Sequence, residues 1–283
     1  MSGVRIVTDS ACDLSPALAS AAHVTVVPLT IRFGEEELQD RIELSPEEFW
    51  RRCKGAATLP ETAAPSPGAF QQAFEAAADD GADAVVCLTL SSGVSATYQS
   101  ALAGAAGMAG GPPIEVVDTR TLTMGQGLIC LAAAEAAEGG ATLAEVLAGV
   151  HDLLGRTKAF GVVDTLDHLQ RGGRIGGAAA LLGSLLSIKP VVEVRDGVVE
   201  QESKQRTRSR SLQYLIGKAR ADAPLERLAV ANGAADDIDV VLKGLADVEV
   251  AHELVVVDLG PVVGTHAGPG TIGVCYQLPA SRG

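Results

Sequence analysis

The sequence predicts an α/β protein of two α/β domains, the first with a mainly parallel sheet and the second with a mixed or antiparallel sheet and helices. Three observations support this. Buried strand patterns alternate with capped helices through the first half of the chain. A hairpin signal opens a strand-rich second half. Hydrophobic residues make up 47% of the 283 residues, enough for a large core. We place the boundary near residue 150, which gives domains 1–150 and 151–283.

The strands of the first domain are indicated by short runs of Val, Ile, Leu and Thr. Most of these runs are continuous, as in strands that are buried on both faces of a parallel sheet. They cover residues 4–8, 24–29, 84–90 and 114–118.

The helices of this half are marked by their first residues. Ser45-Pro46 supplies an N-cap and a proline at the first helical position, and Glu48 is placed to complete a capping box. Ser66-Pro67 begins a helix that we expect to run to about residue 80. Thr142 and Glu145 have the spacing of a second capping box.

The second half has a different pattern. An Asp196-Gly197 turn lies between two alternating runs, which predicts a β-hairpin over residues 191–200. A helix over 208–221 follows, and further strands are expected at 227–231, 249–257 and 271–278. We therefore expect antiparallel pairing in this half.

Composition excludes several classes of partner. The formal charge is 22 − 35 = −13 and aromatics are 3% of the chain, which is unfavourable for nucleic-acid binding. Five cysteines are scattered without a C-x-x-C pair, as expected for reduced thiols in the cytoplasm. No apolar run reaches about 18 residues, so we expect no membrane span.

Known enzyme motifs are not supported. Residues 268–273 match G-x-G-x-x-G, but no helix, second strand and acidic residue follow them, as a dinucleotide site requires. The chain contains neither a P-loop motif nor a G-x-S-x-G elbow. The five histidines lack metal-ligand spacing. We expect no cofactor and no metal.

Polar turns follow three of the predicted strands, at residues 8–10, 91–99 and 124–127. Ligand sites of open α/β sheets lie at this edge, beyond the carboxyl ends of the strands. Each turn alone can be explained by helix capping. Together with Thr62 and His266, they can also converge on an anion-binding site.

The segment 260–270 contains four glycines and two prolines around Thr265 and His266. Such a composition predicts a tight turn with few backbone alternatives. That turn either leaves His266 in solvent or holds it as a polar anchor for a ligand.

Two basic segments have equally open interpretations. Arg171 and Arg174 flank a Gly-Gly pair. Either the two guanidiniums face a phosphate or an acidic partner, or the segment ends a helix with Gly172 in the left-handed conformation. A second cluster is either a solvated face or a docking surface for a partner. Its members are Lys204, Arg206, Arg208 and Arg210.

Seven segments of the chain form an ordered series of motifs. They are TDSACDL at 8–14, TAAPSP at 62–67, SSGVSATYQ at 91–99, MGQG at 124–127, GGRI at 172–175, IKP at 188–190 and GTHAGPG at 264–270. In this order they resemble the motifs of the DegV family, whose members include the fatty-acid-binding subunits of bacterial fatty acid kinase. The resemblance covers nearly the whole chain.

The chain departs from the family pattern at four positions. Ala63 and Ala64 stand where the family usually has Ser-Gln, and Ala96 where it usually has Gly. His168 stands where an aromatic residue is frequent. These departures bear on chain-length preference and on affinity for a partner.

The resemblance implies one long-chain fatty acid held between the two domains. Thr62, Ser92 and His266 would bind its carboxylate, with Ser91 and Thr265 beside them. The protein would catalyse no reaction itself. It would present the carboxylate to a separate ATP-dependent kinase subunit, which forms an acyl phosphate, and Arg174 and Arg171 would face that subunit.

Two other functions remain open at this point. One is an acyl hydrolase or transferase with Ser92 as nucleophile and His266 as base. The other is a regulatory module that binds a ligand other than a lipid, as the basic cluster at 204–210 indicates.

Overall fold

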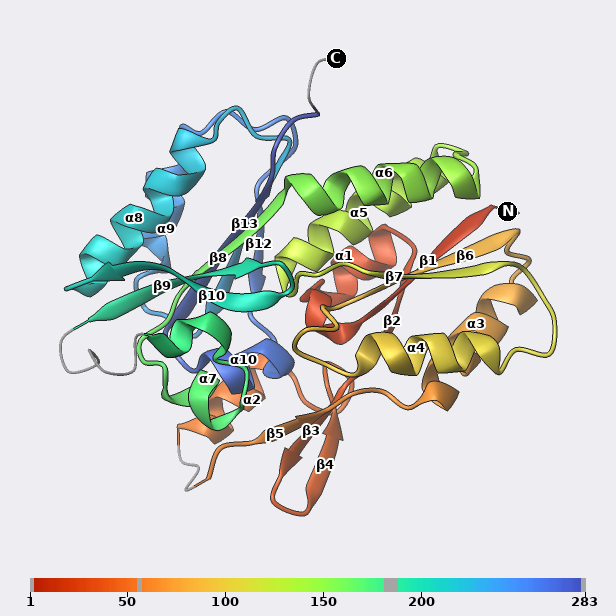
Figure 1. Ribbon diagram of the computed structural model, residues 1–283, viewed down its shortest axis with the longest axis horizontal. Coiled ribbons are helices and arrows are strands. Elements are labelled where there is room, and N and C mark those ends of the chain that lie inside the picture. The colour runs from red at the N-terminus through yellow and green to blue at the C-terminus, as the bar shows by residue number, and fades with distance from the viewer. Residues whose placement is uncertain (1–2, 55–57, 181–187, 281–283) are drawn as a thin grey trace.

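The computed structural model describes residues 3–54, 58–180 and 188–280. Two β-sheets lie side by side in it, one from each half of the chain, and a small third sheet lies next to them (Figure 1). The predicted α/β class, with one parallel and one mixed sheet, is confirmed. The boundary near residue 150 stays a prediction.

The first sheet is parallel throughout and has the strand order β2-β1-β6-β7. Strand β1 has β2 on one side and β6 on the other, so the strand order reverses direction at β1. A crevice is therefore expected beyond the carboxyl ends of β1 and β6. All four strands fall on predicted runs. They are β1 (Val4–Asp9), β2 (Val24–Val27), β6 (Ala84–Thr89) and β7 (Ile114–Asp118).

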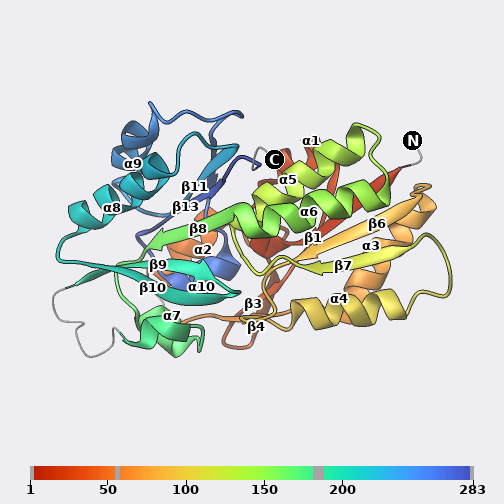
Figure 2. The same ribbon diagram turned by 45° about the horizontal axis from the view of Figure 1, so that its top comes forward.

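Helices cover both faces of this sheet, as both views show (Figures 1 and 2). On one face, Phe70 and Phe74 pack against Val7 and Val85. The helices on that face are α3 (Pro67–Asp79) and α4 (Thr97–Ala106). Those on the other face are α1 (Pro16–Ala21), α5 (Met124–Glu138) and α6 (Leu143–Arg156).

The capping predictions are largely confirmed. Ser45 and Ser66 accept a hydrogen bond from the backbone N–H three residues later, and Thr142 forms the complete capping box with Glu145. The predicted capping box at Ser45 is wrong in one respect. The Glu48 carboxylate binds guanidiniums of its own helix α2 (Pro46–Cys53) instead.

A small antiparallel sheet, which the sequence did not predict, has the strand order β4-β3-β5. Its strands are too short to show a periodic pattern. They are β3 (Thr30–Phe33), β4 (Glu36–Gln39) and β5 (Glu61–Ala63). The last of these carries Thr62.

The second sheet has the order β10-β9-β8-β13-β11-β12 and is antiparallel except between β11 and β12. The predicted hairpin is confirmed, since Asp196 and Gly197 have φ of 51° and 85°, as a type I′ turn requires. The strands are β8 (Thr157–Val162), β9 (Lys189–Arg195), β10 (Val198–Gln205), β11 (Arg227–Gly233), β12 (Val255–Asp258) and β13 (Thr271–Gln277).

One face of this sheet is covered by α8 (Arg208–Ala221) and α9 (Ile238–Leu245), through a core that includes Phe160 and Tyr276. The opposite face turns toward the first half of the chain. Ala159 and Cys275 on that face share the core of α5. The short helices α7 (Asp167–Arg171) and α10 (Pro261–Ala267) lie at one end of the interface (Figure 1).

Three sequence predictions were wrong in detail. The strand expected at 249–257 is confined to Val255–Asp258, apart from an isolated bridge at Val250. The turn expected at 260–270 is largely helix α10, with Pro261 at its first position and Gly268 after its end. Residues 124–127 are the first turn of α5, where Gly127 permits close contact with the carbonyl of Cys12 in the 3-10 helix η1 (Ser10–Cys12).

All five cysteines are unpaired. No helix in the described part of the chain combines the length and apolar character that a bilayer span requires.

Candidate functional site

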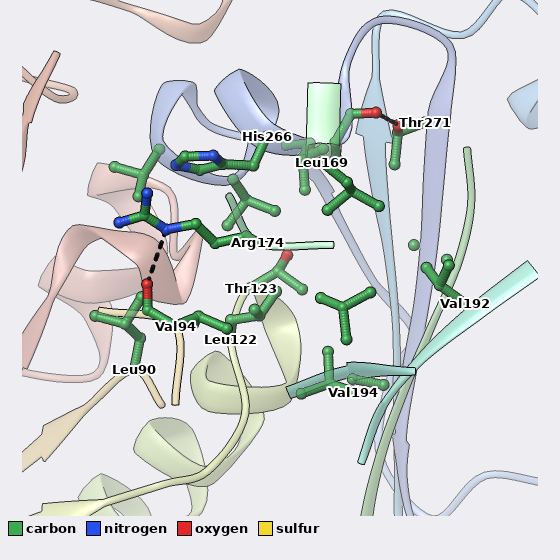
Figure 3. A pocket seen from close by; sticks show the side chains of 18 of the residues that line it. Leu90, Val94, Leu122, Thr123, Leu169, Arg174, Val192, Val194, His266 and Thr271 are labelled. Atoms are coloured by element: carbon green, nitrogen blue, oxygen red, sulfur yellow. Dashed lines mark hydrogen bonds between the residues drawn. The ribbon is translucent and has the colours of Figure 1, made fainter. Parts of the chain in front are cut away.

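A cavity lies between the two sheets and is lined by residues from both halves of the chain (Figure 3). Its empty volume, including the part open to solvent, is about 890 Å³. Most of the described lining is apolar or glycine. The polar side chains among these residues are Thr62, Ser95, Thr123, Arg174, His266 and Thr271.

The structure brings Thr62 and His266 together although 204 residues separate them in sequence. Strand β5 carries Thr62 and helix α10 carries His266. Thr62 Oγ1 lies 2.9 Å from His266 Nε2. Two of the three residues predicted to bind a carboxylate, Thr62 and His266, are therefore in direct contact on the cavity wall.

The other ring nitrogen of His266 determines which atom donates. Nδ1 is buried and has no hydrogen-bond partner among the described residues. A buried N–H without a partner is rarer in proteins than an acceptor without one, so we assign the proton to Nε2. His266 then donates to Thr62 Oγ1, and the hydroxyl hydrogen of Thr62 remains available to a ligand.

The imidazole of His266 is neutral at physiological pH. Burial, with smaller contributions from the nearby Arg174 and His168, lowers its pKa to about 4. The unfolded chain binds a proton near pH 6.5 whereas the folded chain does not. The stability contributed by this group is therefore complete above pH 6.5 and is lost as the pH falls toward 4.

The Gly172-Gly173 pair ends helix α7, which confirms one of its two interpretations. The left-handed residue is Gly173, with φ 69°, and not Gly172 as predicted. Gly172 is needed for another reason, since a Cβ there would lie 2.2 Å from Nδ1 of His266. The turn thus packs directly against the imidazole.

Arg174 connects this turn to the first half of the chain. Its Nη1 donates to the carbonyl of Gly172 at 2.6 Å, and its Nε donates to the carbonyl of Val94 at 3.1 Å. Val94 lies in the loop after β6. The guanidinium lies on the same side of the cavity as His266 (Figure 3). It supplies the positive charge of the described lining.

The serines of the loop after β6 occupy three different environments. Ser91 is buried and donates to the carbonyl of Gly197 at 2.6 Å. Ser92 is exposed and donates to Asp118 Oδ2 at 2.5 Å. Ser95, which the sequence did not single out for the site, lines the cavity and contacts the hydroxyl of Thr97.

Thr265 lies next to His266 in sequence but not among the described lining of the cavity. Its hydroxyl donates to the carbonyl of Pro261 at 2.8 Å, one helical turn earlier, and its side chain is buried. Its own carbonyl accepts a hydrogen bond from Nδ1 of His168 at 3.2 Å. His168 therefore attaches α7 to α10.

Apart from Arg174, the residues of the two basic segments described above divide into two groups. Arg208 is bound to Asp237 and Asp164 and thus belongs to an ion-pair network. Arg171 is exposed, as are Lys204, Arg206 and Arg210.

Among the described residues, the alternative pair of Ser92 as nucleophile and His266 as base does not form. His266 contacts Thr62, and the Ser92 hydroxyl is bound to Asp118. No group of His, Cys, Asp or Glu in the described ranges is arranged to hold a metal ion.

Comparison with known proteins gives one consistent family. A family model described as "Uncharacterised protein, DegV family" matches residues 3–278. A DegV domain-containing protein of Streptomyces coelicolor is 37% identical over 282 residues, which cover 96% of this chain and 97% of that protein.

Solved structures agree with this result. A structure from Thermus thermophilus, described as fatty acid binding of a DegV family protein, has a TM-score of 0.89 at 34% identity and covers 98% of this chain and 100% of that one. DegV from Bacillus subtilis, described as a fatty acid binding protein, has a TM-score of 0.86 at 29% identity, with coverage of 98% and 99%. A stearic acid-binding protein from Eubacterium ventriosum has a TM-score of 0.85 at 26% identity, with coverage of 97% and 98%.

Proposed function

The chain belongs to the DegV family, and from this premise we propose that it binds one long-chain fatty acid in the cavity between its two sheets. The observation that supports this most is the composition of the cavity wall. It is mainly apolar, and it carries the Thr62–His266 pair and Arg174 on one side. An acid with a long hydrocarbon tail has the same division between a polar and an apolar part.

The carboxylate would bind where Thr62 faces the cavity. The Thr62 hydroxyl can donate to an anion because His266 occupies its acceptor side. Arg174 is half-buried on the same side of the cavity, where its Nε and Nη1 donate to the carbonyls of Val94 and Gly172. Because His266 is neutral, the site does not bury a second full positive charge.

The apolar wall would receive the tail. Each buried CH₂ is worth about 0.8 kcal/mol, so a tail of about 16 carbons gains on the order of 10 kcal/mol before the costs of ordering. The tail would therefore supply most of the affinity, and the polar pair would fix the direction in which the acid enters.

Native mass spectrometry tests this function. Protein purified from its producing cells is expected to carry one non-covalent fatty acid per chain, and protein stripped of lipid is expected to take up added palmitate. The unbranched alcohol with the same number of carbons as palmitate serves as the control for tail binding without the carboxylate. A lipid-free protein that takes up no fatty acid would contradict the proposal.

We further propose that the protein presents the bound carboxylate to a separate ATP-dependent fatty acid kinase and performs no chemistry itself. Phosphoryl transfer needs groups that hold phosphates and Mg²⁺, and the sequence has no P-loop to hold them. Arg174 borders the polar side of the cavity, and Arg171 is exposed three residues earlier. These two arginines would face the kinase.

Arg174→Ala is expected to leave fatty acid affinity within about threefold and to slow acyl phosphate formation by the kinase by roughly 10- to 30-fold, the effect of losing one interfacial arginine. The measurement compares palmitate binding with acyl phosphate production from saturating ATP. Arg174→Lys keeps the charge but not the planar fork, so it should recover only part of the rate.

Two results would overturn this role of Arg174. Loss of palmitate binding would assign the guanidinium to the carboxylate site. An unchanged rate of acyl phosphate formation would remove it from the surface that faces the kinase.

A further inference from the structure

Two glycines face each other across the middle of the second sheet. Gly161 on β8 and Gly273 on β13 are direct partners in the antiparallel register. Both strands are interior to the six-stranded sheet. Glycine is unfavourable inside a strand because it loses the most backbone entropy and offers no side chain to pack. A pair of glycines at such a place therefore needs a physical reason.

Among the residues that the structure describes, no contact provides such a reason. Neither glycine has the left-handed φ that would exclude another residue. A Cβ on Gly161 would lie 3.6 Å from Cγ2 of Val192, and one on Gly273 would lie 3.5 Å from Cβ of Ala231. Both are ordinary van der Waals distances. At Gly104, by contrast, a Cβ would lie 2.6 Å from the carbonyl oxygen of Pro67, so helix packing explains that glycine.

The space above the two glycines is the cavity. Gly161 and Gly273 both line it, together with Val192, the partner of Gly161 on β9. The row across the sheet has a valine at β9, bare backbone at β8 and β13, and an alanine at β11. The two glycines therefore leave a trough on the surface of the sheet, between the side chains of Val192 and Ala231.

The trough lies away from His266 and Arg174. Figure 3 shows His266 and Arg174 on one side of the cavity and Val192 and Val194 on the other. Because Gly161 is paired with Val192, the trough belongs to the apolar side. A group that lies there would be hydrocarbon.

We propose that Gly161 and Gly273 are the specificity-determining residues for acyl chain length, and that the far part of a long unbranched tail lies on their bare backbone. This inference rests on the proposed fatty acid binding. It explains why two unfavourable residues occur side by side, since any side chain at either position would fill space that the tail requires.

The test uses Gly161→Val and Gly273→Val. Valine suits an interior strand, so both lipid-free variants are expected to unfold at or above the wild-type temperature. Native mass spectrometry with competing saturated acids of about 12 to 18 carbons measures the profile of chain lengths bound. The longest acids are expected to lose on the order of 10-fold in affinity, as when two CH₂ groups lose their burial, while the shortest lose little.

Two further variants make the comparison sharp. Gly217→Val, on the exposed side of α8 with open space around its Cα, should keep the wild-type profile. Gly161→Ala adds a single methyl group and should give a smaller shift in the same direction, which retains the test if a valine variant fails to fold.

The possible failures are distinguishable. If wild type, Gly217→Val and Gly161→Val all bind the same range of chain lengths, the glycines do not set the length, and fatty acid binding still stands. If wild type binds none of the acids, both the proposed function and the inference fail. A profile that moves to shorter acids only in the glycine-pair variants supports the inference.

Discussion

Replacing Asp13 with asparagine is expected to lower the free energy of unfolding by about 3–5 kcal/mol, because it deprives the buried charge of Arg41 of the carboxylate to which it is hydrogen-bonded. Asp13 is fully buried, and the Arg41 side chain is only 10% exposed. Asparagine has the same shape and tolerates the left-handed backbone of residue 13, whose φ is 58°. The variant therefore keeps the shape of the side chain while it removes the charge and one acceptor oxygen.

The Asp13 carboxylate connects three segments that build the site. Its Oδ1 accepts from Arg41 at 3.0 Å and from the backbone N–H of Gly260 at 2.9 Å. Its Oδ2 accepts from Thr123 at 2.6 Å. Arg41 also donates to the carbonyl of Asp258. Gly260 is the N-cap of α10, so this cluster positions the helix that carries His266.

Urea unfolding of wild type and variants measures the effect. Asp247→Asn serves as the control, since the Arg220–Asp247 pair is largely exposed and is worth less than about 1 kcal/mol. Adding Arg41→Met to Asp13→Asn removes the unpaired charge and should recover part of the loss. If Asp13→Asn and Asp247→Asn destabilise equally, the cluster does not anchor α10.

Removing either member of the Thr62–His266 pair is expected to weaken fatty acid binding by about 1–3 kcal/mol, the range for a buried hydrogen-bonding group that loses its partner. His266→Ala deletes the donor that orients the Thr62 hydroxyl, and Thr62→Val deletes the hydroxyl but keeps the side-chain shape. Palmitate affinity by competition with a fluorescent fatty acid is the measurement.

The two substitutions should not be additive. Because Thr62 and His266 share one hydrogen bond, the double variant should lose little more affinity than either single variant. Thr62→Ser, which keeps a hydroxyl, should bind nearly as well as wild type. His151→Ala, on the exposed side of α6, should have no effect. Full additivity, or unchanged affinity in His266→Ala, would remove the pair from the carboxylate site.

The parts of the fold that the sequence predicted well have strong local causes. The buried run of β6 is apolar at nearly every position, and the Asp196-Gly197 turn requires two residues that tolerate positive φ. Helix α8 was predicted with the same bounds that it has in the structure. In these places local preference and tertiary packing favour the same conformation.

The helix α10 was missed because local preference and packing differ there. Its seven residues include two valines, a threonine and an internal glycine, which are weak helix formers. Tertiary contacts stabilise it. A Cβ on Gly264 would lie 2.8 Å from the rings of Phe49 and Trp50, and Trp50 donates to the carbonyl of Leu259. The flanking Pro261 and Gly268 were the available signals for a helix.

The sequence indicated Thr62 and His266 as possible members of one anion-binding site, and the resemblance to a family assigned them to the carboxylate of a fatty acid. No periodicity links Thr62 to His266, and the small sheet that carries Thr62 depends on contacts distant in sequence. The resemblance selected Ser92, whereas Ser95 lines the cavity in this structure. Which serine of a polar loop faces a cavity depends on the backbone path of that loop, and composition does not encode this path.

A crystal structure of the protein with bound palmitate tests the central claim most directly. We expect the carboxylate within hydrogen-bonding distance of Thr62 Oγ1 and the tail extended over the backbone of Gly161 and Gly273. An acid that binds in the reverse direction, or outside the space between the two sheets, would contradict the account.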